Sequence, residues 1–435
     1  MVLFWFRRDL RLEDNAGLAK ALDLGLPVQP VFVFDRNILD RLEDRSDARV
    51  SFIHQTLTEL DKAFRERGGG LWTYYGTPEE AHAHWMSAHP EIQGVVANRD
   101  YEPYARERDQ RIEALYRQSG RWFKGTKDHV IFEKNEVVKG DGTPYSVFTP
   151  YSRRWRERLA QEGIPHYSSS SWAEGGLNAS ASQLVPLEAM NFVPSALHIP
   201  PCTWSEAQIR QYAQNRNTPS LEQGTTRLGL HLRFGTLSVR MLLKATQSLS
   251  DTFVNELIWR DFYQMVLFHA PESPQKAIKS AYDLIQWEHH EEHFQRWCQG
   301  LTGYPLVDAG MRQLNATGFM HNRVRMVVAS FFTKHLLLDW RLGEAYFAQK
   351  LLDYDQASNV GGWQWASGSG NDAAPYFRIF NPASQLSTFD PQYAYVKRWV
   401  PEFGTPSYPM PIVDHAFARQ RCLERYKSAL SQAQS

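Results

Sequence analysis

The stretch VLFWFRRDLRL, residues 2–12, decides the fold of the N-terminal part of the chain. Its first five residues form a short apolar run of the kind that makes a buried strand, and polar residues follow at once. Similar runs recur downstream between amphipathic segments, which is the pattern of a parallel α/β sheet. We expect strands at 2–6, 28–34, 71–75 and 95–97, and helices at 47–67 and 103–118. No G-x-G-x-x-G follows the first strand, so a dinucleotide site of the Rossmann type is not predicted there.

Beyond this part the pattern changes twice. Residues 128–200 are rich in Gly, Pro and Ser and predict an interdomain linker, with one helical segment at 151–160. From there to the end, apolar residues recur at spacings of three and four, which predicts helices at 206–216, 239–247, 251–268, 305–317, 321–338 and 340–352. We therefore predict an α/β domain, residues 1–127, a linker, residues 128–200, and an all-α domain, residues 201–435.

Composition sets broad limits on function. The 435 residues carry a formal net charge of zero, so DNA binding would require a local basic face rather than an overall positive charge. The three cysteines form no close pair and no metal-binding spacing, which favours a reduced, cytoplasmic setting without a metal. No apolar stretch is long enough to cross a membrane. Fourteen Trp exceed what a core of this size needs, which invites a functional interpretation for some of them.

The segment NELIWRDFY, residues 255–263, places Glu256, Trp259, Arg260 and Tyr263 on one helix face. One interpretation is a solvated ion pair between Glu256 and Arg260 beside a packed Trp. The other is a pocket that stacks a flat ring and hydrogen-bonds its edge.

A second segment, GFMHNRVRM, residues 318–326, puts two cations at the start of an apolar helix. Arg323 and Arg325 there oppose the helix dipole, so each needs an anion. The anion could be an external phosphate or an internal carboxylate, that of Asp353 or Asp355. We expect one arginine to bind a phosphate and the other to pair internally.

The most specific segment is DYDQASNVGGWQW, residues 353–365, which continues through GNDAAPYFRIFNP, residues 370–382. Together with GYPLVDAGMRQL, residues 303–314, and FWFRRDLRL, residues 4–12, it resembles the photolyase/cryptochrome family. Matching motifs extend to IVDHAFAR, residues 412–419, so the resemblance covers the whole chain.

The resemblance implies FAD, folded into a U in the helical domain and active in its reduced form. It places the FAD phosphates near Tyr212 and near Thr225, Thr226, Arg227, Leu228 and Gly229, with Gly229 standing where the family usually has Ser. Asp353, Asp355 and Asn359 should face the isoalloxazine, and Arg325 belongs to the same cofactor set.

Asn322 and Met326 stand where members that repair (6-4) photoproducts carry histidines, so the chain looks like a class I enzyme for cyclobutane pyrimidine dimers. This implies a lesion pocket formed by Glu256, Asn322, Met326, Trp259 and Trp365, next to the catalytic Asn359. The flipped-out lesion would lie between the two Trp, with its carbonyl edge on Glu256. DNA contacts are expected from Glu256, Trp259, Arg260, Tyr263, Asn322, Arg323 and Gln385. Phe319 and Val360 depart from the usual Trp and Asn.

Three further expectations follow from the resemblance. Trp363, Trp340 and Trp287 match an electron-transfer chain, the alternative being that they only fill the core. Tyr104 and Ala105 replace the Asn-Glu pair of folate-binding relatives, so an antenna of the flavin or deazaflavin type, or an empty pocket, is expected. The chain is expected to act as a monomer on damaged DNA.

The main alternative function is that of a cryptochrome, a blue-light photoreceptor that signals to partners without repairing DNA. A flavin electron-transfer protein is a second alternative. Asn359 is the residue typical of the repair enzymes, and only a short segment follows Pro401, which favours repair.

Overall fold

The computed structural model describes residues 1–168 and 176–433; residues 169–175 of the predicted linker lie outside this range. The described residues form two compact units that interleave along the sequence. The first unit comprises residues 1–136, 156–203 and 228–247, and the second comprises residues 137–155, 204–227 and 248–435. The positions of the predicted boundaries at residues 127 and 200 stay a prediction.

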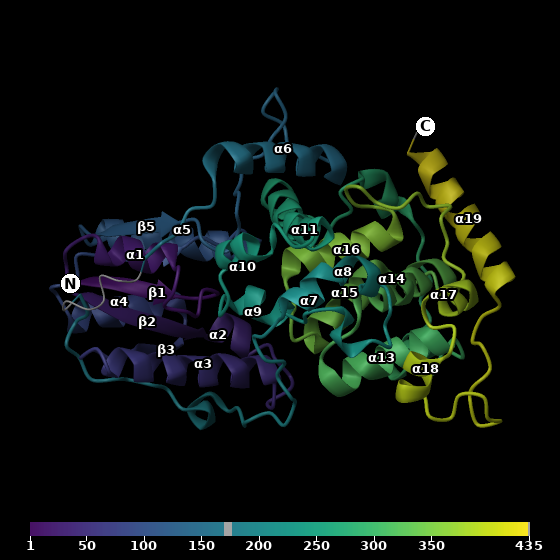
Figure 1. Ribbon diagram of the computed structural model, residues 1–435, viewed down its shortest axis with the longest axis horizontal. Helices are drawn as coiled ribbons and strands as arrows, with labels where there is room; N and C mark the ends of the chain where they lie inside the picture. The colour runs from purple at the N-terminus through teal and green to yellow at the C-terminus, as the bar shows by residue number, and fades with distance from the viewer. Residues whose placement is uncertain (169–175, 434–435) are drawn as a thin grey trace. The chain divides into compact units, whose positions relative to one another are not determined.

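A five-stranded parallel sheet forms the centre of the first unit (Figure 1). Its strand order is β3-β2-β1-β4-β5. The strands are β1 Val2–Phe6, β2 Val28–Asp35, β3 Trp72–Gly76, β4 Gly94–Asn98 and β5 Trp122–Thr126. The first four were predicted. Strand β5 was missed because its sequence WFKGT is half-buried at the sheet edge and has no apolar run.

Strand β1 alternates its side chains between two cores, as a buried parallel strand should. Phe4 and Phe6 pack with helices α1, Ala16–Leu22, and α3, Ala48–Arg65. Trp5 packs on the other face with helices α4, Pro78–Ala88, and α5, Pro103–Gln118. A short helix α2, Arg36–Leu39, follows β2. The sheet is therefore covered by helices on both faces.

Two later helices, α9 Gly229–Phe234 and α10 Val239–Thr246, also belong to the first unit. A buried ion-pair network attaches α10. The Arg240 guanidinium contacts the carboxylates of Asp14, at 3.0 Å, and Asp128, at 2.9 Å. Burial alone would raise the pKa of Asp128, but Arg11 and Arg240 lower it to about 2.

Helices make up the second unit, and its main core is formed by α13 to α16. The helices are α7 Glu206–Arg210, α8 Tyr212–Asn215, α11 Asp251–His269, α12 Glu291–Gln299, α13 Pro305–Thr317, α14 Asn322–Ser330, α15 Trp340–Lys350, α16 Gln356–Ser367, α17 Pro382–Phe389, α18 Ala394–Trp399 and α19 His415–Gln432. Helix α6, Phe148–Glu162, begins in this unit. The predicted fold class, an α/β part followed by a helical part, is confirmed.

Two predicted helices differ in detail from those observed. The segment 206–216 is broken at Gln211 into α7 and α8. The segment 321–338 leaves α-helical geometry after Ser330 and continues as a π-helical turn, Phe331–His335. No helix in the described ranges combines the length and the apolar character that crossing a bilayer requires.

Candidate functional site

Helix α11 presents the four residues of the NELIWRDFY segment on a half-buried face, while Leu257, Ile258 and Phe262 on its other side are buried. The four are Glu256, Trp259, Arg260 and Tyr263. Helix α16 packs against both α11 and α14, so the three predicted segments come together in the second unit.

The carboxylate of Glu256 forms an ion pair with Arg216, the residue that caps the C-terminus of α8. The predicted alternative partner on the same helix was Arg260. Burial raises the pKa of Glu256, although the Arg216 guanidinium opposes the shift. A carboxyl group in this state can serve either as acceptor or, once protonated, as donor.

The two arginines of α14 have different partners. Arg325 donates to Asp353 at 2.9 Å, which confirms the expected internal pairing for one of them. The Arg323 guanidinium donates to Asn217 Oδ1 at 2.9 Å and lies 4.4 Å from the ring centroid of Phe389. In the described part of the chain Arg323 contacts no carboxylate, so it keeps its positive charge available for an external anion.

His321, at the N-cap of α14, is a buried neutral histidine. Its Nδ1 accepts a hydrogen bond from the Arg323 backbone N–H at 3.2 Å, which leaves the proton on Nε2. Burial first, and then Arg325 and Arg323, lower the pKa of His321 to about 4. Among the described residues, buried Nε2 has no hydrogen-bond partner. Its N–H is therefore a donor without an acceptor. Asn322 is exposed and Met326 half-buried on the same helix.

Asp355, the second Asp of the DYD motif, is the N-cap residue of helix α16. The Asp355 carboxylate accepts from the backbone N–H of Ser358 at 3.0 Å and from Gln264 Nε2 at 3.0 Å. One turn later, Asn359 Nδ2 donates to Glu344 Oε1 at 2.9 Å. Because its amide nitrogen is engaged, Asn359 has its carbonyl oxygen left to accept from another group.

The predicted phosphate segment spans both units, since Thr225, Thr226 and Arg227 belong to the second and Leu228 and Gly229 to the first. Arg227 has a positive φ of 53°. Its guanidinium lies 4.9 Å from the ring centroid of Phe319, and Arg325 lies 5.7 Å from the same ring. Phe319, which stands where the family usually has Trp, therefore has two guanidinium groups close to its ring.

The remaining assigned side chains lie in the second unit. Tyr212 is buried and packs edge-on against Phe253, at 5.2 Å between ring centroids. Trp365 and Gln385 are half-buried, on α16 and α17.

Trp363 and Trp340 are buried and Trp287 is half-buried. Ring contacts in the described residues join Trp363 to Trp297, at 6.2 Å, and Trp287 to Tyr426, at 6.1 Å. Within that set, Trp363 has no ring contact with Trp340. Trp297 was not singled out from the sequence, since it lies in an ordinary amphipathic helix.

The buried polar groups that lack partners in the described part of the second unit fit a flavin. Gln264 Oε1 and Arg227 Nε are buried without a partner among the described residues. On α16, a Cβ added to Gly362 would meet nothing within 4 Å, whereas one added to Gly361 would strike the ring of Tyr263 at 2.2 Å. A buried donor and a buried acceptor without partners are groups that a polar planar ligand can satisfy.

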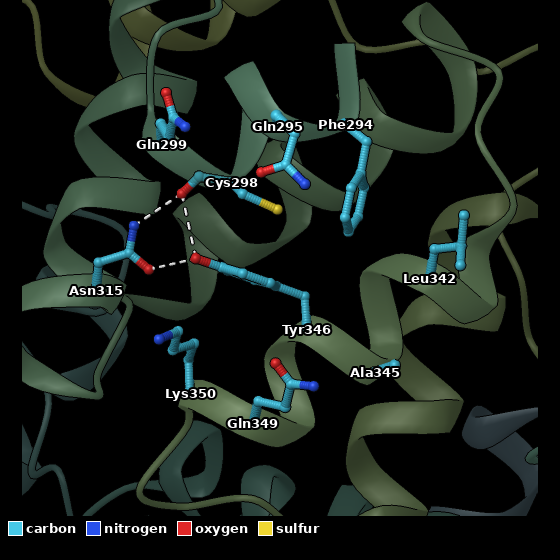
Figure 2. A pocket seen from close by; sticks show the side chains of 10 residues that line it. All are labelled: Phe294, Gln295, Cys298, Gln299, Asn315, Leu342, Ala345, Tyr346, Gln349 and Lys350. Carbon is cyan, nitrogen blue, oxygen red and sulfur yellow. Dashed lines mark hydrogen bonds between the residues drawn. The ribbon is translucent and has the colours of Figure 1, made fainter. Parts of the chain in front are cut away.

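A separate hollow of about 570 Å³ lies among α12, α13 and α15 (Figure 2). Tyr346 donates to Asn315 Oδ1 at 2.7 Å, and Asn315 Nδ2 donates to the carbonyl of Cys298 at 2.8 Å. These polar groups are satisfied by one another, and none of the predicted site residues lines the hollow. We assign it no function.

Known protein families match residues in both units. The sequence model of the "FAD binding domain of DNA photolyase" matches residues 253–407, and that of "DNA photolyase" matches residues 2–168. A deoxyribodipyrimidine photo-lyase from Alkalihalophilus pseudofirmus is 34% identical over 97% of this chain and 97% of its own. The Escherichia coli protein of that name is 35% identical over 98% of each chain.

Among solved structures, the archaeal photolyase of Sulfolobus tokodaii, which contains two FAD molecules, superposes with a TM-score of 0.85. It is 33% identical and is matched over 98% of this chain and 99% of its own.

Proposed function

This chain belongs to the DNA photolyase and cryptochrome family, and from that premise we propose that it is a light-driven enzyme that splits cyclobutane pyrimidine dimers in DNA. The observation that carries the proposal is the half-buried face of α11, where Trp259 offers a stacking surface beside the hydrogen-bonding carboxyl of Glu256. This face lies in the matched FAD-binding domain. The relatives named deoxyribodipyrimidine photo-lyase match nearly the whole chain.

FAD is the cofactor of this domain. Asp353, Asp355, Asn359 and Arg325 would hold the ring system, and Tyr212 with the segment 225–229 would hold the phosphates. When bound in its reduced form and excited by blue light, FAD supplies an electron that opens the cyclobutane ring and is afterwards returned. The carbonyl oxygen of Asn359, left to accept by its bond to Glu344, can take a hydrogen bond from a ring N–H.

The protein's own part is to hold the lesion outside the duplex. Extrusion costs a few kcal/mol and is easiest at a damaged, poorly paired step. Trp259 and Trp365 would enclose the apolar side of the dimer, with Asn322 and Met326 completing the pocket. Because burial raises the pKa of Glu256, its protonated form, which can donate to a dimer carbonyl, persists to a higher pH than in an exposed Glu.

The DNA strand would be held by Arg260, Tyr263, Arg323 and Gln385. Since the net charge of the chain is zero, binding must rest on such local cations, and affinity should fall steeply with salt. Replacing Arg323 by Gln should reduce the slope of log affinity against log salt by about 1.

The decisive experiment exposes a dimer-containing oligonucleotide to blue light with the reduced, FAD-loaded protein. Dimers should disappear in the light and persist in the dark. Glu256→Ala and Trp259→Ala should weaken repair far more than they lower flavin content. If dimers persist in the light, the repair function is refuted and a signalling role of the cryptochrome kind takes its place.

We also propose that Trp363, Trp340 and Trp287 conduct electrons toward the flavin. Trp363→Phe should then abolish light-driven reduction of oxidised FAD while leaving repair by chemically reduced enzyme intact. Loss of repair in that second assay would assign Trp363 to packing instead.

For the antenna we propose a flavin-type pigment in the first unit. In that unit the hydroxyl of Tyr104 is already bonded to Asp35 and Asn37. Mass spectrometry of the pigments released from the purified protein tests this, and a folate would contradict it.

A further inference from the structure

The start of helix α6 forms an aromatic contact with the proposed lesion-binding face. The ring of Phe148, the first residue of α6, lies parallel to the indole of Trp259. The centroids are 3.7 Å apart and the planes differ by 2°. The sequence assigned residue 148 to the interdomain linker, yet its contacts belong to the second unit.

Phe148 is held in place from two sides. On one side, the backbone carbonyl of Ser146, two residues before Phe148, accepts a hydrogen bond from the Asp372 backbone N–H at 2.9 Å.

On the other side, the next two turns of α6 are attached to α11. The ring of Tyr151 packs on Phe262 at 5.2 Å, and Trp155 Nε1 donates to buried Asp261 at 2.9 Å. The Phe148 ring itself also packs edge-on against Phe262 at 5.9 Å, so contacts on both sides set its position apart from the stack itself.

The stack restricts how Trp259 can meet a ligand. One indole face is covered by Phe148, Phe262 packs edge-on at 5.5 Å and 85°, and the Tyr263 ring lies tilted by 31° at 5.4 Å. Part of the Trp259 side chain nevertheless remains exposed. An otherwise mobile half-buried indole would lose rotamer freedom on binding, and a prior stack removes that loss.

We propose that Phe148 is a positioning residue for lesion recognition, which fixes the Trp259 indole so that its exposed part is ready to receive the extruded dimer. The inference rests on the proposed function. It assigns Phe148 no contact with the substrate, so its effect must pass through Trp259.

The test is dark binding by the FAD-loaded full chain to two oligonucleotides that differ only by one cyclobutane dimer. Phe148→Leu removes the ring and should weaken binding of the damaged oligonucleotide by about 2- to 12-fold, the range that an aromatic pair contributes. Binding of the undamaged oligonucleotide and the flavin absorbance should not change. Phe148→Tyr keeps the ring and should restore discrimination to within about 2-fold of the wild type.

Tyr151→Leu is the matched control, because it loosens α6 through Phe262 without removing the stack. It should lower thermal stability at least as much as Phe148→Leu while changing the damaged-to-undamaged affinity ratio less. If the two variants lower that ratio equally, or if Phe148→Leu loses flavin, Phe148 is merely structural and the inference fails.

A double-mutant cycle separates this inference from the proposed function. In a Trp259→Ala background, Phe148→Leu should have no further effect on dimer affinity, because the residue through which it acts is gone. Additive losses would overturn the positioning role. A wild-type protein that binds both oligonucleotides equally would instead refute lesion recognition itself, whereas wild-type discrimination with an unaffected Phe148→Leu variant would refute only the role of Phe148.

Discussion

Asn359 is held through its amide nitrogen by Glu344, which leaves its neutral carbonyl oxygen as its contribution to the site. We predict that Asn359→Asp lowers the midpoint potential of bound FAD, because a carboxylate disfavours the additional negative charge of the reduced flavin. A destabilisation of about 1.4 kcal/mol corresponds to about 30 mV for a two-electron couple.

Spectroelectrochemical titration of the variant and the wild type would measure the shift in the midpoint potential of bound FAD. The new Asp and Glu344 would share a proton in acid, so the effect should be larger at about pH 8 than at about pH 6. Asn191→Asp, on an exposed turn of the first unit, should leave the potential unchanged. An unchanged potential in Asn359→Asp would place this residue away from the ring.

Residue types could be predicted from the sequence better than residue partners. Spacing along one helix was enough to put Glu256 and Trp259 on a common face. It could not identify Arg216 as the ion-pair partner of Glu256, because that contact joins residues 40 positions apart. For the same reason Phe148 was missed, since nothing near it in the chain hints at a stack on Trp259.

At the scale of single elements, helix α16 contains two adjacent glycines whose substitution should have different effects. A methyl group at Gly361 would collide with the Tyr263 ring, whereas one at Gly362 would enter open space. Gly361→Ala should therefore destabilise the apoprotein by about 1–3 kcal/mol through overpacking. Gly362→Ala should leave the apoprotein as stable or up to ~1 kcal/mol more stable, since Ala favours a helix.

The two variants should also separate in cofactor binding. If the flavin lies against this face of α16, Gly362→Ala should weaken FAD affinity by at least about tenfold, the equivalent of ~1.4 kcal/mol. Urea unfolding of the apoprotein and fluorescence titration with FAD measure the two effects. Normal FAD affinity in Gly362→Ala would mean that the open space serves another purpose.

Helix α10 contributes one buried cation, Arg240, to the ion-pair network of the first unit. Arg240→Leu should destabilise the protein by about 3–5 kcal/mol, because buried Asp14 loses its arginine and buried Asp128 keeps only Arg11. Arg210→Leu, which breaks only the exposed pair with Glu206, should change the unfolding free energy by less than about 0.5 kcal/mol. Urea unfolding compares the two, and equal losses would contradict the importance of burial.

Several elements with a strong apolar period were predictable, and β5 and α16, which lack one, were not. Strands β1 to β4 were found because their runs are apolar and bounded by polar residues. Helix α16 was not predicted, since Asn359 and the Gly361-Gly362 pair lower helix propensity. The tertiary packing of Trp363 and Val360 in the core favours the helix over that local preference.

For the whole molecule, the α/β part and the helical part could be predicted because each has its own hydrophobic period along the chain. The interleaving of the two units along the chain could not be predicted. It depends on contacts such as Arg240 with Asp14 and Phe148 with Trp259, which join residues more than a hundred positions apart. Such contacts leave no periodic trace in a single sequence.

Three buried histidines make stability depend on pH across the molecule. Burial first, and nearby cations second, lower the pKa of His321 to about 4 and that of His82 to about 3. Burial and then His415 lower that of His335 to about 3. Each is neutral in the folded protein but titrates near 6.5 once unfolded. Between about pH 6.5 and about pH 4 the unfolded chain therefore binds more protons, so the free energy of unfolding falls as pH is lowered.

The substitution His82→Gln tests how much one of these three histidines contributes to the pH dependence. Gln is neutral at every pH and can still bond to the hydroxyl of Tyr116, the partner of His82 Nδ1. Relative to this variant, the wild type should lose about 1.4 kcal/mol of unfolding free energy per pH unit between about pH 6 and about pH 4. Urea unfolding at stepped pH measures the difference. Parallel curves for wild type and His82→Gln would mean that His82 takes up its proton in the folded state, which a fully buried ring beside Arg7 and Arg108 should resist.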